Sequence, residues 1–176
     1  PLYSSAASDV YKRQVLASNF APSAAAAEAS ESYTDSSSVY TRTVSNTEPS
    51  VGQTITYRQT FTTKRSTDSI YNWQNKVDVC LKYVPGSATL QIGDGAAAPL
   101  PSSAVGAEPG VTSITSTDAR EYWEFSAANP HTFALTYEVS AECSTEKPLE
   151  SGFAYTYKGW WGKSSKDYAP NKFNAV

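Results

Sequence analysis

Apolar and polar residues alternate with a period of two along much of the chain. Within 54–61, Ile55, Tyr57 and Phe61 lie on one face and alternate with threonine and arginine on the other, and 132–143 shows the same spacing over a longer stretch. This period is typical of a β-strand with one face in a core, and no helical spacing competes with it. We predict that both segments are half-buried strands.

A third strand is predicted at 76–84, where the alternation ends at a Pro85-Gly86 turn. Its register places Val77, Val79, Leu81 and Tyr83 on the apolar face, and Asp78, Cys80 and Lys82 on the polar face. Further strands are predicted at 39–45, 88–93, 111–116, 121–126 and 152–161. About eight short strands separated by Gly and Pro turns predict an all-β fold, an immunoglobulin-like antiparallel β-sandwich of about seven to nine strands.

The 176 residues suffice for one domain with a substantial core. Residues 93–110 are rich in glycine, alanine and proline, as a linker would be. Neither flank holds enough strands to close a core of its own, so we predict a long surface loop within a single domain.

Both ends of the chain differ from its middle. Residues 1–14 resemble a translated sequencing-adapter remnant, and 15–37 resemble a signal-peptide remnant followed by a disordered linker. The alanine run within 15–37 offers A-x-A cleavage sites, which places the mature start near Glu28. We expect the sandwich domain at 38–162, a truncated C-terminal segment at 163–176, and a secreted or extracellular protein that associates with the cell wall.

Composition argues against several classes of partner. The formal net charge is −3 and the 14 lysines and arginines are scattered, so the basic stripe needed for phosphate contacts is missing and nucleic acid is not an expected partner. No stretch after the signal-like segment approaches the ~18 apolar residues of a membrane span. No motif indicates a cofactor. Twelve tyrosines and abundant threonine suit pleated strands.

Three segments together resemble a known family. EPSVGQTITYRQTFTT, VCLKYVPGSATL and NPHTFALTYEVSAEC are similar to the bacterial surface-protein repeat of unknown function, through a V-G-x-x-I-T-Y strand, a P-G turn and a late strand after a proline-containing turn. The likeness covers about residues 38–160, although TKRSTDS stands where that family usually has Asn-x-Gly. It implies an immunoglobulin-like sandwich of secreted and cell-wall proteins, without catalytic residues.

The two cysteines, Cys80 and Cys143, could be a nucleophile, metal ligands or a disulfide. Catalysis would need a histidine, and the sequence contains only His131, at a predicted turn; a metal site would need about four ligands at recognisable spacing. An even count in an oxidising compartment favours a disulfide. One conflict remains, since Cys80 has polar-face parity and Cys143 has apolar-face parity. A bulge, or a bridge at the ends of the strands, would reconcile them.

The remaining candidates are weaker. His131 is expected to make a surface hydrogen bond rather than act as a base, since no G-x-S-x-G motif is present. The acidic residues that could bind calcium lack the D-x-D-x-D-G spacing, so no metal site is expected. They are Asp94, Asp118, Glu121 and Glu124.

Trp160 and Trp161 are the candidate ligand-binding residues, because adjacent side chains in a strand cannot both point inward. We expect a non-catalytic structural or adhesion-type module that contacts a cell-wall or host protein or a glycan. The alternatives are a carbohydrate-binding module that uses these tryptophans with neighbouring tyrosines, and a small secreted hydrolase.

Overall fold

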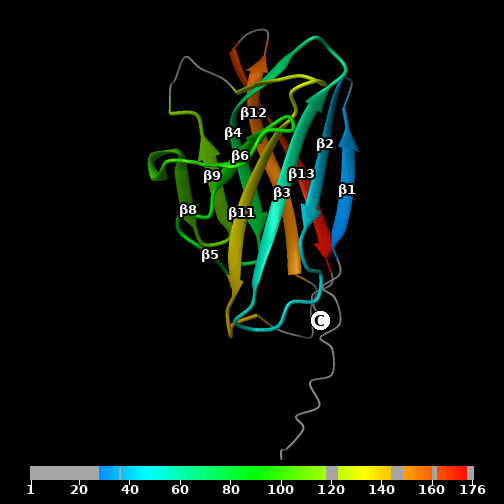
Figure 1. The fold of residues 1–176 in the computed structure, drawn as a ribbon. Helices are drawn as coiled ribbons and strands as arrows, with labels where there is room; N and C mark the ends of the chain where they lie inside the picture. The colour runs from blue at the N-terminus through cyan, green and yellow to red at the C-terminus, as the bar shows by residue number, and fades with distance from the viewer. Residues whose placement is uncertain (1–27, 36, 118–122, 144–148, 160–161, 174–176) are drawn as a thin grey trace, which may run out of the picture.

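The fold is a sandwich of two antiparallel sheets, seen in a computed structural model that describes residues 28–35, 37–117, 123–143, 149–159 and 162–173, with backbone alone over 158–173 (Figure 1). The predicted all-β class is confirmed. The described residues form thirteen strands where about seven to nine were predicted. None of them forms a helix that is long and apolar enough to cross a membrane.

Sheet A, which faces the viewer in Figure 1, has the strand order β1-β2-β3-β11-β6-β7, and the short strand β5 pairs with β11 beyond the end of β6. Its strands are β1 (Ala29–Thr34), β2 (Ser38–Val44), β3 (Thr54–Thr63), β5 (Leu81–Tyr83), β6 (Thr89–Ile92), β7 (Ala98–Pro99) and β11 (His131–Val139).

Sheet B lies behind it with the order β13-β12-β4-β9-β8, and β10 pairs with β4 beside β9. Its strands are β4 (Asp68–Val77), β8 (Val105–Glu108), β9 (Val111–Thr115), β10 (Trp123–Phe125), β12 (Leu149–Gly159) and β13 (Gly162–Phe173). The long strands β4 and β11 thus hold corresponding places in the two sheets, since each carries two short neighbours on one edge.

Aromatic rings fill the space between the sheets. Trp73, Tyr57, Phe61 and Phe133 are fully buried, and the Phe61 and Phe133 rings meet edge to face at 5.9 Å between centroids. Buried aromatic side chains remove large apolar areas from water, so they supply much of the driving force for closing the sandwich. The alternation predicted for 54–61 is confirmed, and that for 132–143 is confirmed as far as Val139, because the apolar positions there are the inward ones. β11 ends at Val139, so Ala141 lies in a turn and is exposed.

The predicted strand 76–84 is wrong as a single element. β4 ends at Val77, and the chain turns before β5 begins at Leu81, whose backbone N–H donates to the Asp78 carbonyl at 3.0 Å. Parity does not carry across a turn, so Val79 is 61% exposed and Cys80 is buried, the reverse of the expected faces.

The surface loop predicted at 93–110 is also wrong in part. The segment contains β7, a 3₁₀ turn at Ser102–Ala104 and β8. Because β7 belongs to sheet A and β8 to sheet B, this segment carries the chain from one sheet to the other. Its Gly and Pro content suits two short edge strands joined by turns.

The sandwich extends beyond the expected limits of 38–162. β1 lies within the segment expected to be a disordered linker, and β13 occupies most of the segment expected to be a truncated end. β1 is short of apolar residues, and it forms because each of its residues pairs with β2. Residues 1–27 lie outside the described part of the chain, so the signal-peptide interpretation stays a prediction.

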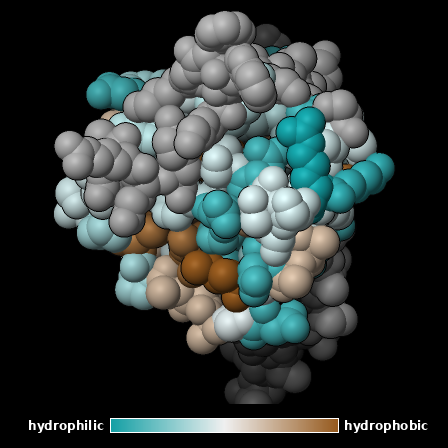
Figure 2. Space-filling view, turned by 90° about the horizontal axis from the view of Figure 1, so that it is seen from above, coloured by the Kyte–Doolittle hydropathy of each residue, from teal (hydrophilic) through white to brown (hydrophobic). Residues whose placement is uncertain are grey.

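The first residue of β1 and the last residue of β13 lie at the same end of the sandwich. Ala29 pairs with Val44 at the end of β2, and Phe173 pairs with Leu149 at the start of β12 (Figure 1). The opposite end carries the exposed β3–β4 turn, and the coloured part of Figure 2 shows hydrophilic side chains there beside a small hydrophobic group.

Candidate functional site

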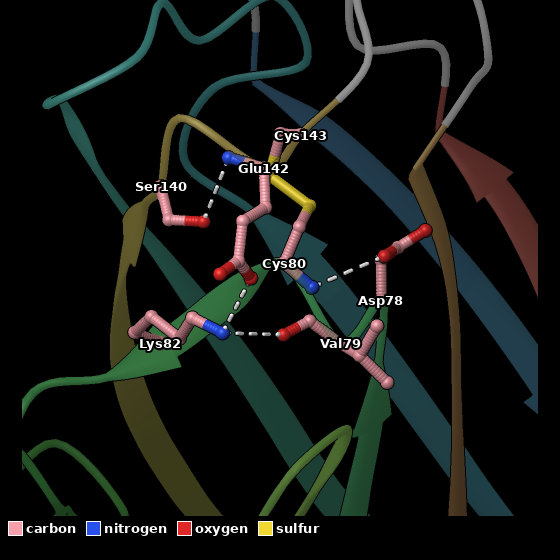
Figure 3. Close-up of a disulfide and its surroundings, with 7 residues drawn as sticks. All are labelled: Asp78, Val79, Cys80, Lys82, Ser140, Glu142 and Cys143. Atoms are coloured by element: carbon pink, nitrogen blue, oxygen red, sulfur yellow. Dashed lines mark hydrogen bonds and ion pairs between the residues drawn. A yellow bond between two sulfur atoms is a disulfide. The ribbon is translucent and has the colours of Figure 1, made fainter.

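The predicted disulfide between Cys80 and Cys143 is present, at the end of the sandwich where β1 begins and β13 ends (Figure 3). Their Cα atoms lie 5.0 Å apart, within the range that a disulfide requires. Cys80 precedes β5, Cys143 follows β11, and these two strands pair in sheet A. The bridge therefore ties together two adjacent strand ends, which removes the conflict of parity.

Hydrogen bonds between residues close in sequence shape the turns that hold the two cysteines (Figure 3). The Cys80 N–H donates to Asp78 Oδ1 at 3.2 Å, and the Cys143 N–H donates to the Ser140 carbonyl at 3.0 Å. Lys82 Nζ lies 2.8 Å from Glu142 Oε2 across the bridge, but both side chains are more than half exposed, so this ion pair adds little stability. Cys80 and Cys143 thus have a structural role.

The predicted ligand-binding pair Trp160 and Trp161 lies outside the described residues, as do Asp118 and Glu121. Asp94 and Glu124 are exposed, on a turn and on β10. Across the part of the chain that the structure describes, no group of three or more His, Cys, Asp or Glu side chains is arranged to hold a metal ion.

His131 is not the surface turn residue that was expected. It begins β11, is 5% exposed and packs near the Phe125 ring, with 6.5 Å between ring centroids. Burial lowers the pKa of His131 below its usual value, partly offset by a backbone hydrogen bond with Asn129. Within the described part of the chain, no group hydrogen-bonds to its Nδ1. Burial thus favours the neutral form of this imidazole.

An arginine in the core is the least expected feature. Arg42 points inward from the middle of β2, is fully buried, and places its guanidinium carbon 4.6 Å from the centroid of the Tyr57 ring. None of its three side-chain nitrogens donates a hydrogen bond to any described residue. Burial lowers the pKa of Arg42 to about 10, while nearby tyrosines act in the opposite direction.

The cross-strand neighbours of Arg42 do not neutralise it. Glu31 pairs with it on β1, but the Glu31 carboxylate accepts a hydrogen bond of 2.7 Å from the Tyr33 hydroxyl. Gln59 pairs with it on β3, and the Gln59 amide donates to the Thr41 carbonyl at 3.3 Å. The Tyr57 ring is the aromatic face on which the guanidinium lies, and such contacts are worth about 2 kcal/mol or more when desolvated. Electrostatic attraction from Tyr137, Tyr33 and Glu31 adds to it.

The outer face of sheet A carries two threonine pairs that join β3 to β11. Thr60 and Thr132 bring their hydroxyl oxygens to 2.8 Å, and Thr56 and Thr136 to 2.9 Å. Between these pairs, Arg58 of β3 faces Ala134 of β11. Alanine has a short side chain, so the sheet surface dips there between two polar ridges.

A groove of about 300 Å³ occupies this dip, and β6 and its flanking turns form its second wall. Ser87 lies between β5 and β6, which pair with the same edge of β11. Its hydroxyl accepts a hydrogen bond of 3.1 Å from the Thr136 N–H and so connects this stretch to β11. The Arg58 side chain is exposed and makes no hydrogen bond or ion pair with a described residue. The lining residues are Thr56, Arg58, Ser87, Thr89, Gln91, Ala97, Thr132, Ala134 and Thr136.

Sequence reasoning did not find this groove. The period of two does identify the outward residues of β3 and β11. It does not reveal that Thr56 and Thr60 lie opposite Thr136 and Thr132, which depends on strand order and register.

Comparison with known proteins shows the fold. No protein-family model matches the chain, and no curated protein is similar in sequence at a significant level. Among solved structures, BcpA, the major pilin subunit of Bacillus cereus, has a TM-score of 0.53 and 10% identity, over 85% of this chain and 41% of that one. A chain of the RrgA Jo.In complex has a TM-score of 0.53 and 11% identity, over 82% of this chain and 83% of that one.

The pilus backbone RrgB from Streptococcus pneumoniae is also similar, with a TM-score of 0.45 and 13% identity, but this chain spans only 26% of its length. At these identities the likeness concerns the fold and carries no residue roles. Membership of the surface repeat family named above stays a prediction. The chain is an immunoglobulin-like antiparallel β-sandwich with the fold found in pilin subunits of bacteria.

Proposed function

We propose that this chain is a non-catalytic structural or adhesion-type module of a bacterial surface or cell-wall protein. The observation that carries the proposal is the pilin-like sandwich, matched over 85% of the chain by BcpA. A module of this fold acts by being durable and by presenting a surface, since the space between its sheets is filled with buried side chains.

Two further features support an extracellular, non-catalytic role. The Cys80–Cys143 bridge is typical of oxidising compartments. His131, the one histidine of the sequence, is buried with its pKa lowered, so it is poorly placed for proton transfer with a substrate in solvent.

Surface location can be tested on intact cells of the producing organism. Antibodies raised against the oxidised full chain should label intact cells, and external protease should remove the label without lysing the cells. Protein recovered from the surface should contain no free thiol. Labelling that requires permeabilised cells would contradict the proposal, and so would two free thiols in the recovered protein.

The absence of catalysis has its own test. The oxidised protein should turn over no substrate in a panel of ester, peptide and glycoside chromogens, and His131→Gln should give the same result. Turnover that His131→Gln abolishes would establish the hydrolase alternative instead.

Glycan binding through Trp160 and Trp161 remains a second proposal, supported by the argument that adjacent strand residues face opposite sides. A glycan array probed with the full chain and with a Trp160→Ala, Trp161→Ala variant tests it. Signal that is equal for both proteins, or absent for both, would remove these residues as the platform.

A further inference from the structure

The groove on the outer face of sheet A is a site that none of the preceding functions uses. We propose that it binds a saccharide that carries a carboxylate, a sugar acid, with Arg58 as the cationic partner and the threonine pairs as partners of the sugar hydroxyls. This goes beyond the proposed function, because a surface module could be displayed and durable with this groove unused.

The size and shape of the groove suit a small polar ligand. A volume of about 300 Å³ is at the lower end of the range for small-molecule sites. The short side chain of Ala134 forms the floor, so a ring can approach the sheet between the two threonine pairs. The groove crosses three neighbouring strands, β3, β11 and β6, whose pairing fixes the lining side chains in register.

The lining is chemically matched to hydroxyl groups. Threonine hydroxyls both donate and accept hydrogen bonds. The Gln91 amide donates one N–H to the Gly93 carbonyl at 3.3 Å and keeps a second N–H and its carbonyl oxygen for a ligand. Thr56, Thr136 and Thr132 line the groove, and Thr60, the partner of Thr132, lies just outside the lining. In the Thr56–Thr136 pair the hydrogen bond uses one donor, so a second hydroxyl hydrogen and free lone pairs remain for a ligand. No aromatic side chain lines the groove, which disfavours an apolar ligand.

The charge pattern selects the class of sugar. Arg58 is the one charged residue of the lining and has no partner within the described part of the chain. A guanidinium binds a carboxylate through two parallel N–H···O bonds, a geometry that neutral sugars cannot satisfy. One cation is also too few for a nucleic-acid backbone, which is bound through several phosphates.

The test is an amide-shift titration of the full oxidised chain with digalacturonic acid. The methyl ester of the same disaccharide and sodium acetate serve as matched ligands. Digalacturonic acid is expected to shift the amides of Thr56, Ala134 and Thr136 with a millimolar dissociation constant. The ester should bind about tenfold more weakly, since it lacks the charge-assisted bonds, and acetate should leave Thr56 and Thr136 unshifted.

Variants separate the groove from general charge effects. Arg58→Gln should weaken binding about tenfold, and Ala134→Leu should fill the floor and abolish it. Arg65→Gln removes the same charge from an exposed turn outside the groove and should change nothing. Each protein is first checked for an unchanged amide spectrum.

Three results with the sugar acid would overturn the inference, and one with acetate would do the same. They are the absence of shifts at the groove, equal affinity for the acid and its ester, and equal weakening by Arg58→Gln and Arg65→Gln. Shifts produced equally by acetate would show a simple anion at Arg58 and would also overturn it. None of these results bears on surface display, which the labelling of intact cells tests separately.

Discussion

The Arg42 guanidinium lies over the Tyr57 ring inside the sandwich, 4.6 Å from the ring centroid, and no carboxylate of the described residues accepts a hydrogen bond from it. A buried cation loses its hydration, and a single aromatic face returns only part of that free energy. The lowered pKa of Arg42 expresses the same imbalance. The core therefore contains a residue that weakens it.

Replacing this arginine should stabilise the protein. Arg42→Met keeps a long, flexible side chain in the core and removes the charge, so the free energy of unfolding should rise by about 1–3 kcal/mol. Urea unfolding at neutral pH measures the change. Arg65→Met, on an exposed turn, is the control and should stay within about 0.5 kcal/mol of the parent. A loss of stability in Arg42→Met would show that the Tyr57 contact outweighs the cost of burial.

Removing the disulfide should lower stability substantially. The bridge closes a loop with a sequence separation of 63, for which the chain-entropy model gives about 4 kcal/mol. We expect Cys80→Ser with Cys143→Ser to lose about that amount in urea unfolding, and the reduced parent to match the double variant. Agreement between the oxidised and reduced parent would show that the bridge contributes nothing.

Stability should fall on mild acidification because of His131. Its pKa is lowered in the folded state, so the unfolded chain binds a proton first as the pH falls below about 6.5. The contribution of His131 to the free energy of unfolding is therefore fully present above that pH. It declines below that pH by up to about 1.4 kcal/mol per pH unit. Unfolding measured from pH 7.5 to 5 should show this slope in the parent, and His131→Gln should flatten it. An equal slope in both proteins would assign the effect to other groups.

Two glycines in turns allow the cost of backbone strain to be separated from the cost of steric contact. Gly86 and Gly110 share a φ of +78°, but a Cβ at Gly86 would meet nothing within 4 Å. A Cβ at Gly110 would lie 3.2 Å from both the Val77 carbonyl oxygen and Val79 Cγ1. Gly86→Ala should cost about 1–2 kcal/mol from conformation alone, and Gly110→Ala should cost more. Equal melting temperatures for the two variants would contradict this.

The sequence was informative wherever a strand is regular and one face is buried. In β3 and β11 the period of two identified every large apolar side chain of the core, because the pleat puts alternate residues on opposite faces. The disulfide was also predictable, since composition and context left few other roles for two cysteines.

β4 could not be read from its pattern. Its buried residues Ile70 and Trp73 are three positions apart, because the pairing with β12 shifts register at this point. A bulge adds one residue and interrupts the period of two, and the polar Asn75 faces inward a little further along. There the buried Asn75 amide donates to the Tyr137 hydroxyl at 3.0 Å, a partner 62 positions away.

The groove and the buried arginine needed the tertiary structure. Arg42 has inward parity in a strand that was predicted correctly, but parity alone does not tell whether a charged residue at such a position is buried. The groove depends on the dip at Ala134 and on β6 lying beside β11, which are relations between strands distant in sequence.

The shared end of the two outer strands determines how the domain would respond to a pulling force. Tension between Ala29 and Phe173 acts on β1 and β13, which are edge strands of different sheets among the described elements. Ala29 and Phe173 lie at one end of the sandwich, so the load would break the hydrogen bonds of the β1–β2 and β13–β12 pairs one after another. It would not shear all of these hydrogen bonds at once. The Cys80–Cys143 bridge stands at the same end and would keep β5 joined to β11 after the outer strands have peeled away. The domain would thus extend in stages under tension and retain a covalently closed centre from which it could refold.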